Sequence, residues 1–549
     1  MAAATPPGRT GVSGPHRWLS RAVTVLAVAL VWAALVVPTH LAQLTPAAFL
    51  RIPVEGLAGA ALLLVLLTRV RRRVAPILGG LLGVLLIVRG LDIGFLETLA
   101  RPFDPVTDWG LLGDATGFLG ETGGRAAAIA LAAAAVLLAL ALVVGLALAG
   151  ARIGRLLAAH RTGSARALVG LGAVWVVCAL VGAQLVPSVP VASRSAASLA
   201  RFEAEQIPAS LRDRAAFARE ATVDRYRDTP PAQLLAGLHG KDVVLAFVES
   251  YGRSALTDPA LSPRVDAALD AGSAQLAAAG FAARSGFLTS PIVGGGSWMA
   301  HATLLSGLRI DDQQRYRSLV TSDRLTLTAA FRGAGWETTA IMPGTSKAWP
   351  EGRFYGIDRP HPADDLGYRG PAYGWSSMPD QYALAQFQQR ENARPDRGPL
   401  MSEVVLTSSH QPWTAVPSMT GWDRLGDGSV FATLPAPTSD APDPQRGKEQ
   451  YARSIAYSVA SLISWTATYG DDDTVLVFLG DHQPVPAVTG PGASRDVPIT
   501  VVAKDPTVLD RIADWHWDAG LRPGPDAPVW PMEAFRDRFF QAFGTPHPA

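Results

Sequence analysis

Apolar residues in the first third of the chain gather into five long runs. These runs cover residues 18–37, 47–68, 74–88, 126–150 and 167–186. Most of them approach the roughly 20 residues that a helix needs to cross the hydrocarbon core of a bilayer. The second run is the weakest, because Arg51 and Glu55 interrupt its beginning. The pattern predicts a bundle of about five transmembrane helices within residues 1–187.

Arginine residues mark one side of the predicted membrane. They are frequent before the first run, between the second and third runs, and between the fourth and fifth runs. Such arginine-rich segments stay in the cytoplasm. The segment from 90 to 125 instead carries six acidic residues against Arg101 and Arg125, and is predicted to face outward. Because the number of runs is odd, we expect the chain after residue 187 to lie outside the cytoplasm.

A cleaved signal peptide is the alternative explanation of the first apolar run. No small-residue cleavage site follows that run, whereas four further apolar runs do. We therefore expect the first run to remain in the protein as a membrane helix, and the protein to be a multi-pass protein of the cell membrane.

The pattern changes from about residue 238 onward, where short apolar runs alternate with helical periodicity. The short runs cover residues 243–248, 338–342, 404–407, 475–479 and 499–502, and the helical patterns include 261–279 and 448–469. This alternation predicts an α/β domain with a mostly parallel sheet and helices on both faces. The expected organisation is a transmembrane domain at 1–187, a stalk with helices at 198–205 and 208–227 within 188–237, and an extracytoplasmic catalytic domain at 238–549. Residues 416–446, rich in glycine and proline, are expected to form a surface loop.

The amino-acid composition indicates a membrane protein and argues against some classes of binding partner. Of 549 residues, 48% are hydrophobic, and the excess lies almost wholly before residue 190, as expected for a membrane protein. The single cysteine, Cys178, excludes a disulfide within the chain. A net charge of +1 argues against nucleic acid as a partner.

Polar residues follow two of the predicted strands at the point where each strand ends. Glu249 comes directly after the run 243–248, and Asp481 and His482 come after Gly480 at the end of the run 475–479. In open α/β sheets the chemistry lies at the carboxyl ends of the strands. Two carboxylates and an imidazole suit one divalent ion, Mn²⁺ or Zn²⁺. The alternative is a hydrogen-bonded Asp–His pair without metal.

A second candidate site begins with three consecutive glycines, Gly294 to Gly296, followed by Ser297 at the start of a helical pattern. Glycine lets the backbone approach a ligand closely, and a helix N-terminus favours an anion. Ser297 is the candidate nucleophile, since a divalent metal can activate a hydroxyl group. The alternative is that Ser297 only caps the helix, which serine often does. His301 either faces this site or packs in the interior.

These motifs carry a family resemblance. The segments 243–252, 294–298 and 480–484, in this order after five apolar runs, resemble the lipoteichoic-acid-synthase-like membrane enzymes of the sulfatase and alkaline phosphatase superfamily. The resemblance implies a sulfatase/alkaline-phosphatase-like domain. It also implies that one metal ion is held by Glu249, Ser297, Asp481 and His482.

The resemblance further implies that Trp349, Arg353 and His410 bind the phosphoglycerol group of the substrate, with Arg353 and His410 taking part in catalysis beside Ser297. Arginine offers a bidentate fork for phosphate, and histidine exchanges protons near neutral pH. A surface ion pair for Arg353 and a structural histidine at His410 are the alternatives.

The sequence also departs from the family. Its members usually carry threonine at the position of Ser297. In sulfatases proper, a Cys or Ser precedes x-Pro-x-Arg, whereas Ser297 is followed by Trp298-Met299-Ala300-His301. This difference argues against the hydrolysis of sulfate esters.

Two classes of function follow. In the first, a membrane enzyme moves a phosphoglycerol-type headgroup from an anionic phospholipid to an envelope glycan or glycolipid, through a covalent phosphoserine. A phosphodiesterase, a phosphoethanolamine transferase or a sulfuric-ester hydrolase of the same superfamily is the alternative within this class. In the second, the domain is a metal-free scaffold for envelope assembly.

Overall fold

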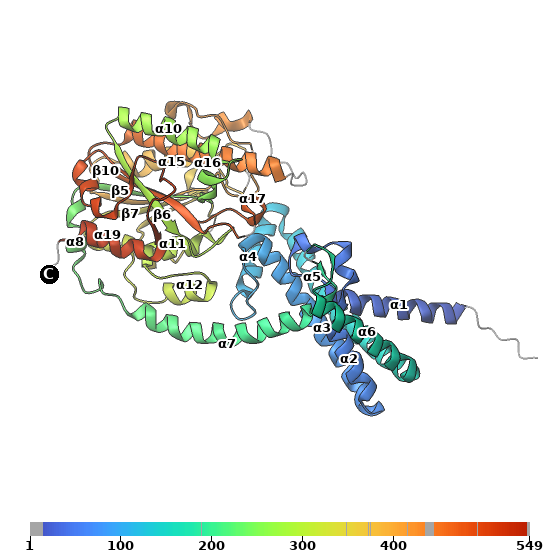
Figure 1. Cartoon of the computed structure of the whole chain (residues 1–549). Helices are drawn as coiled ribbons and strands as arrows, with labels where there is room; N and C mark the ends of the chain where they lie inside the picture. The colour runs from blue at the N-terminus through green and yellow to red at the C-terminus, as the bar shows by residue number, and fades with distance from the viewer. Residues whose placement is uncertain are drawn as a thin grey trace, which may run out of the picture. The chain divides into compact units, whose positions relative to one another are not determined.

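The computed structural model describes residues 15–187, 189–346, 349–371, 373, 375–413, 415–433, 444–490 and 492–545. The chain divides into two compact units. The helical unit comprises Met1–Glu97 and Arg101–Leu211, and the sheet unit comprises Thr98–Ala100 and Arg212–Ala549. Figure 1 shows the elements of both units.

Long apolar helices build the helical unit. Its helices are α1 (Pro15–Val36), α2 (Val54–Val65), α3 (Thr68–Leu99), α4 (Trp109–Gly123), α5 (Arg125–Ala159) and α6 (Arg161–Val181). Within the described residues, four helices are long and apolar enough to cross a membrane, namely α1, α3, α5 and α6. The second predicted run forms only the 12-residue α2. At 1.5 Å per residue, α2 is about 18 Å long and too short to span the core alone.

Hydrogen bonds nevertheless show that α2 begins at the end of the helical unit where α1 ends, so that α2 runs back toward the opposite end. Arg51, just before α2, donates to the carbonyl oxygen of Val36 at the end of α1. Arg89, in the last third of α3, donates to the carbonyl oxygens of Val37 and Ser195, so this part of α3 lies at the same end of the unit as the end of α1 and the chain after α6. The chain therefore enters α1 and leaves α6 at opposite ends of the helical unit.

Close packing joins α3 to α5. A Cβ atom at Gly79 would lie 2.1 Å from the carbonyl oxygen of Leu146, a distance that only glycine permits. Small residues of this kind let the backbones of two membrane helices approach each other.

The sheet unit contains a mixed sheet with the strand order β12-β6-β11-β10-β5-β9-β7-β8, and β13 pairs with β6. Strands β10, β5, β9, β7 and β8 are parallel, and β11 runs antiparallel to β10 and β6. The strands are β5 (Asp242–Val248), β6 (Ala282–Thr289), β7 (Glu337–Met342), β8 (Arg359–Pro362), β9 (Leu400–Leu406), β10 (Thr474–Gly480), β11 (Asp496–Ala503), β12 (Asp518–Ala519) and β13 (Val529–Pro531). All five predicted strands are confirmed. The pattern missed β6, β8, β12 and β13.

Helices cover both faces of this sheet. In Figure 1, α10 (Ser262–Ala278), α15 (Asp380–Phe387) and α16 (Pro444–Tyr469) lie on one face, and α11 (Ser297–Ser306) and α19 (Phe535–Phe543) lie on the other. The two helices predicted at 261–279 and 448–469 are α10 and α16. The predicted helices at 198–205 and 208–227 form the single helix α7 (Ser195–Thr222), which continues through Pro208. Part of the predicted loop 416–446 lies outside the described residues.

The shorter helices connect these elements. They are α8 (Pro231–Leu234), α9 (Ser254–Thr257), α12 (Gln313–Val320), α13 (Leu327–Gly333), α14 (Gly352–Tyr355), α17 (Pro486–Thr489) and α18 (Pro506–Asp510).

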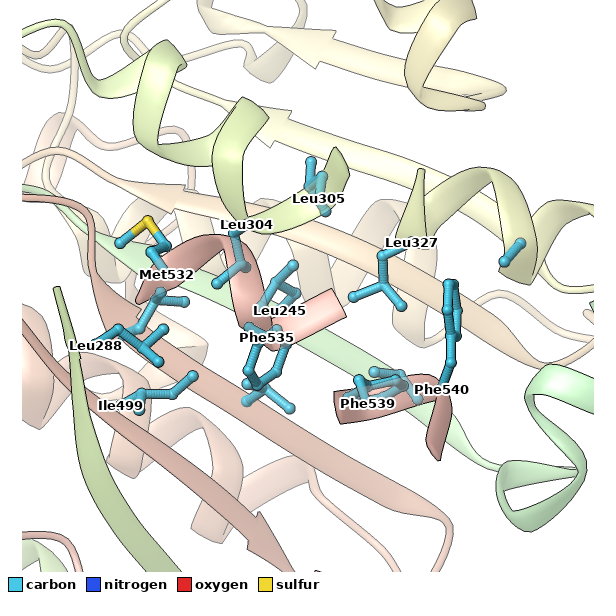
Figure 2. Close-up of a cluster of buried hydrophobic side chains, with 14 of the residues drawn as sticks. Leu245, Leu288, Leu304, Leu305, Leu327, Ile499, Met532, Phe535, Phe539 and Phe540 are labelled. Carbon is cyan, nitrogen blue, oxygen red and sulfur yellow. The ribbon is translucent and has the colours of Figure 1, made fainter. Parts of the chain in front are cut away.

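A hydrophobic core fixes α11 on the sheet. Figure 2 shows Leu245, Leu288 and Ile499 of the strands beside Leu304 of α11 and Phe535 at the start of α19, and all five side chains are buried. Burial of each such side chain contributes roughly 1.5–3 kcal/mol. Because α11 begins at Ser297, this core also holds the candidate nucleophile in place.

Candidate active site

Two neighbouring strands bring the predicted ligands together. Strands β5 and β10 are parallel and adjacent, with Val248 opposite Gly480. Glu249 and Asp481, the next residue on each strand, therefore leave the sheet side by side. Gly480 is required at this point, because a Cβ atom there would lie 1.8 Å from the carbonyl oxygen of Tyr251.

Glu249, Asp481 and His482 form a cluster whose ligand atoms all lie within 4.8 Å of one another, and all three residues are buried. The Oδ1 atom of Asp481 accepts hydrogen bonds from the backbone amides of Ser250 and His482, each at 2.7 Å. Its Oδ2 atom is buried and has no hydrogen-bond partner. A buried acceptor without a hydrogen bond lowers the stability of the fold by about 1–3 kcal/mol. A cation bound to Oδ2 would offset this loss.

The orientation of His482 fits a metal ligand. Its Nδ1 atom lies 2.8 Å from the backbone oxygen of Gln483 and donates a proton to it. This leaves the Nε2 atom directed at the cluster, 3.3 Å from Oε1 of Glu249, where loss of its proton would free a lone pair for a metal ion. A second hydrogen bond of this kind fixes the tautomer of metal-bound histidines. These three residues therefore form a possible site for a divalent metal ion.

The charges of the cluster attract a cation. Burial and the charge of Glu249 raise the pKa of Asp481 to about 6. Burial acts to lower the pKa of His482, but the charges of Asp481 and Glu249 outweigh it and raise that pKa to about 9. Burial also opposes ionisation of Glu249, yet the charge of His482 and a hydrogen bond from it hold the pKa of Glu249 well below the usual range. Two carboxylates thus share the single positive charge of His482. A divalent metal ion would balance both carboxylate charges.

Ser297 is the first residue of α11, and its hydroxyl group faces the cluster. The Oγ atom donates to Oε2 of Glu249 at 2.8 Å and lies 3.2 Å from Nε2 of His482. The N-cap position belongs to Gly296, whose φ angle of +84° is one that glycine adopts without strain. The hydroxyl group of Ser297 is thus directed at the metal ligands, and it does not cap the helix.

His410 follows β9 at the same edge of the sheet. Its ring stacks on Trp375 with the ring centroids 3.9 Å apart. Burial lowers the pKa of His410, and the charge of Glu249 offsets this only in part. The ring is therefore neutral at pH 7 and able to accept a proton.

Asp380 holds the turn that carries His410, and the sequence analysis missed it. Its Oδ1 atom accepts hydrogen bonds from the backbone amides of Thr407 and Ser408 at 2.8 and 3.0 Å, and Ser458 donates to Oδ2 at 2.5 Å. Asp380 begins α15, far from His410 in the sequence, and an isolated Asp at a helix start reads as an ordinary helix-terminus residue. No local pattern could have indicated its role.

Trp349 and Arg353 follow β7, so they lie beyond the same edge of the sheet as the cluster. Trp349 stacks on Tyr355 with the ring centroids 5.4 Å apart, and Arg353 is exposed on α14. Among the residues that the structure describes, neither makes a hydrogen bond or ion pair with Ser297 or the metal ligands. Their role in substrate binding stays a prediction.

Comparison with known proteins finds solved structures of low similarity only. No family model and no curated protein matches the sequence. The lipoteichoic acid synthase LtaP from Listeria monocytogenes matches with a TM-score of 0.35 and 13% identity, over 61% of this chain and 80% of that chain. The phosphoglycerol transferase GacH from Streptococcus pyogenes, solved with sn-glycerol-1-phosphate, matches with a TM-score of 0.35 and 12% identity, over 60% and 91%.

A third structure is a protein of the alkaline phosphatase superfamily from Vibrio parahaemolyticus. It matches with a TM-score of 0.33 and 17% identity, over 54% of this chain and 69% of that chain. Independently of these matches, apolar N-terminal helices precede a sheet unit with helices on both faces, as the apolar pattern predicts.

Proposed function

We propose that this protein is a membrane-anchored, metal-dependent phosphotransferase that acts outside the cytoplasm. It moves a phosphoglycerol-type headgroup from an anionic phospholipid to an envelope glycan or glycolipid. The proposal rests on the Ser297 hydroxyl group, which lies 2.8 Å from Glu249 and 3.2 Å from His482. In this position the hydroxyl oxygen joins the ligand atoms of the cluster, so one cation would bind and activate it.

One Mn²⁺ or Zn²⁺ ion would be held by Glu249, Ser297, Asp481 and His482. When bound, it supplies positive charge that favours the ionised serine and the phosphate group. The proton of the Ser297 hydroxyl group leaves along the hydrogen bond to Glu249. Because Glu249, Asp481 and His482 are buried, water is largely excluded from them, and the attraction between these ligands and a cation is stronger than it would be in water.

The transfer takes two steps. First, a bond forms between Oγ of Ser297 and phosphorus, the bond to the diacylglycerol oxygen breaks, and that oxygen takes up the serine proton. Second, an acceptor hydroxyl group attacks the phosphoserine and loses its proton to neutral His410, while the bond between phosphorus and Oγ of Ser297 breaks. The Ser297 oxygen takes up one proton and His410 gives one up, so that both return to their starting state. Trp349 and Arg353 would hold the glycerol and phosphate groups of the donor.

The proposed location follows from the helical unit. Its chain enters and leaves at opposite ends, and the arginine-rich segments before α1 and between α5 and α6 would lie in the cytoplasm. The catalytic domain, proposed to begin near residue 238, is then extracytoplasmic, where lipid donors of the outer leaflet and envelope acceptors meet. A reporter active only outside the cytoplasm should work when fused after Ala549 and stay silent at Arg72.

Trapping the covalent intermediate tests the mechanism. Purified full-length protein is incubated with headgroup-labelled phosphatidylglycerol and Mn²⁺ and is then quenched. A peptide containing Ser297 should carry the labelled phosphoglycerol group by mass spectrometry, with one equivalent of diacylglycerol released. Diacylglycerol release without any labelled peptide, even in a rapid quench, would contradict the phosphoserine step and favour a phosphodiesterase that uses water directly.

A further inference from the structure

A cavity of about 770 Å³ lies within the helical unit. This volume falls in the range of roughly 300–1,000 Å³ typical of small-molecule sites. Its lining includes Arg51, Asp92, Trp175, Arg194 and Phe202. These residues come from the segment before α2, from α3, from α6 and from the chain that follows α6.

The wall formed by the chain after α6 is held by side chains from three membrane helices. The buried Arg89 of α3, which is 2% exposed, donates to the carbonyl oxygen of Ser195 at 2.7 Å. Trp175 of α6 donates to the carbonyl oxygen of Ser193 at 3.3 Å, and Glu55 of α2 accepts from the amide of Ala197 at 2.8 Å. An arginine buried in an apolar helix is costly and is kept where it has a function. Here it fixes the cavity wall.

The chemistry of the lining selects an anionic amphiphile. Two guanidinium groups, Arg51 and Arg194, stand against the single carboxylate of Asp92. Arg51 also donates to the carbonyl oxygens of Val36 and Ala48, so it adds mainly charge, and Arg194 offers the hydrogen bonds. Guanidinium groups bind phosphate with two parallel hydrogen bonds. The outer face of α6 beside the cavity exposes Val177, Leu180 and Val181, a surface suited to acyl chains. Tryptophan beside such a surface is typical of the membrane interface.

We propose that this cavity binds the headgroup of an anionic glycerophospholipid, with the phosphate at Arg194 and Arg51 and the acyl chains along α6. This goes beyond the proposed function, because lipid retention by the helical unit requires no turnover at Ser297. The site would keep an anionic lipid bound to the protein whichever reaction the sheet unit performs.

Native mass spectrometry of the full-length Ser297→Ala variant tests the proposal, since this variant cannot consume bound lipid. Phosphatidylglycerol and phosphatidylcholine are added at equal concentrations. Loss of one charged hydrogen bond costs about 1.5 kcal/mol or more, so Arg194→Gln should weaken phosphatidylglycerol binding roughly tenfold, to the level of phosphatidylcholine. Arg166→Gln, which removes an exposed arginine from the first turns of α6, is the matched control and should change nothing.

Equal retention of the two lipids, or unchanged retention by Arg194→Gln, would overturn the assignment. Glycerol phosphate without acyl chains provides the second arm of the test. If it binds as tightly as the lipid, the cavity takes a soluble phosphate ester and the lipid assignment is wrong.

A buried pair next to the nucleophile carries a second, independent inference. His301 lies one helical turn after Ser297 on α11, and its Nδ1 atom is 3.3 Å from Oε1 of Glu403 in β9. The His301 ring stacks on Phe247 of β5, with centroids 3.7 Å apart. The sequence left open whether His301 faces the site or packs. In the structure its ring packs on Phe247 and its Nδ1 atom lies beside Glu403, and both partners belong to strands that lead to the site.

Each contact of this pair reaches an element that carries a site residue. Helix α11 begins with Ser297, β5 ends before Glu249, and β9 leads to His410. The second polar atom of each partner, Nε2 of His301 and Oε2 of Glu403, is buried without a hydrogen-bond partner. A pair retained at this cost, one turn from the nucleophile, has a role besides packing.

We infer that His301, held by Glu403, is a positioning residue that sets Ser297 relative to Glu249 and His410. A misplacement of about 1 Å can cost roughly a hundredfold in rate. His301→Phe, which keeps the stacking but loses the polar contact with Glu403, should lower kcat by about ten- to a hundredfold, with KM and bound metal within about twofold. His301→Gln, which can still donate to Glu403, should recover much of kcat.

His361→Gln is the matched control, since His361 is also part-buried and lies 2.7 Å from a glutamate, Glu391. It should lower thermal stability without lowering kcat. If His301→Phe changes only stability, as the control does, the positioning role is refuted. The inference rests on the proposed transfer reaction, and unchanged turnover by Ser297→Ala would show that the proposed function, and not the positioning, is wrong.

Discussion

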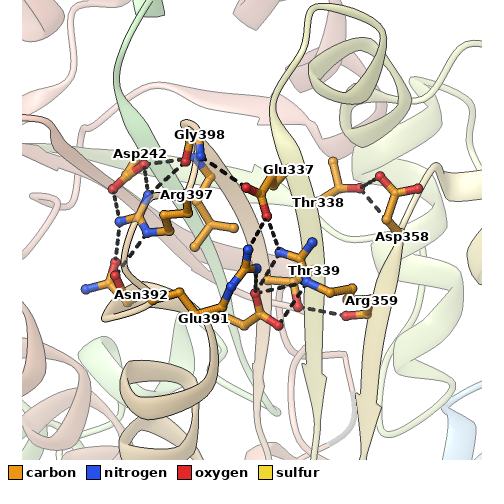
Figure 3. A network of polar contacts seen from close by, with 12 residues as sticks. Asp242, Glu337, Thr338, Thr339, Asp358, Arg359, Glu391, Asn392, Arg397 and Gly398 are labelled. Carbon is orange, nitrogen blue, oxygen red and sulfur yellow. Dashed lines mark hydrogen bonds and ion pairs between the residues drawn. The ribbon is translucent and has the colours of Figure 1, made fainter.

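The two edges of the same sheet use carboxylates in opposite ways. At the amino edge, Asp242, Glu337 and Glu391 all meet guanidinium groups, as Figure 3 shows. Arg397 binds Asp242, Arg359 joins Glu337 to Glu391, and Arg394 contacts both glutamates. At the carboxyl edge, Glu249 and Asp481 meet each other and His482, and no arginine or lysine pairs with them among the described residues.

The pKa values follow this difference. Burial acts to raise the pKa of Glu391, but hydrogen bonds from His361 and Arg359 and the charge of Arg359 outweigh it and hold the pKa at about 2. At the other edge, burial and a neighbouring carboxylate raise the pKa of Asp481 to about 6. The amino edge thus contains its own arginine countercharges, whereas at the carboxyl edge two carboxylates share the single positive charge of His482, an arrangement that favours a bound cation. The first arrangement stabilises the fold, and the second suits a functional site.

The largest effect is expected from removing the hydroxyl group at the carboxyl edge. Ser297→Ala should lower the rate of headgroup transfer by at least about 10⁴-fold, because the nucleophile is lost. Metal content should stay near the wild-type value, since Glu249, Asp481 and His482 remain. Ser297→Thr adds only a methyl group and should keep part of the activity. Ser306→Ala, at the other end of α11, is the control, and ordinary turnover by Ser297→Ala would mean that another group attacks.

Metal binding should depend on the histidine at the carboxyl edge of the sheet and not on the histidine at the amino edge. His482→Ala should weaken Mn²⁺ or Zn²⁺ binding by at least about a hundredfold, because loss of even an outer-shell partner costs ten- to a hundredfold. His361→Ala removes a histidine beside a buried glutamate at the amino edge and should leave metal content unchanged. Elemental analysis of both purified variants measures this. A folded His482→Ala protein with full metal content would disprove the metal site.

Removing one carboxylate charge should change the free energy of unfolding in opposite directions at the two edges. In metal-free protein at pH 7, Glu391→Gln should lower the free energy of unfolding by about 3 kcal/mol, because it leaves arginines without their partner. Asp481→Asn should raise it, on the order of 1 kcal/mol, because it relieves repulsion between buried carboxylates. Urea unfolding of both variants gives these values. Changes of the same sign in both variants would remove the distinction between the edges.

The Glu391 effect should also depend on pH in a defined direction. The pKa of Glu391 is lower in the folded state than in the unfolded chain, so its stabilisation is complete above about pH 4.5 and is lost as the pH falls toward 2. The wild type and Glu391→Gln should therefore converge in stability at low pH. A constant difference down to pH 2 would show that packing, and not charge, is the cause.

The smallest effect concerns the acid limb of the activity profile. Because burial lowers the pKa of His410, the neutral ring needed to accept a proton persists below the usual value. The wild type should keep more than about half of its kcat/KM at pH 6.5. His410→Gln should lower activity and flatten this limb, whereas His361→Gln should leave it unchanged. An acid limb that is identical in His410→Gln would assign the titration to another group.

The sequence by itself determined the local parts of this protein. Apolar runs of about 20 residues are typical of membrane helices, and short continuous runs such as 243–248 and 475–479, bounded by polar residues, are typical of strands buried on both faces. Because chemistry in such sheets lies where strands end, Glu249, Asp481 and His482 could be selected before any contact was known. The glycine-rich start of a helix likewise singled out Ser297.

Only the tertiary structure decided which strands are neighbours. Pairing of β5 with β10 joins residues more than 200 positions apart in the chain, and nothing in either strand specifies the other. The same holds for Asp380 under the His410 turn, for His301 against Glu403, and for the arginines at the amino edge. Local periodicity reports which face of an element is buried, whereas the partner of a buried polar group is set by long-range packing, which a single sequence does not encode in any local pattern.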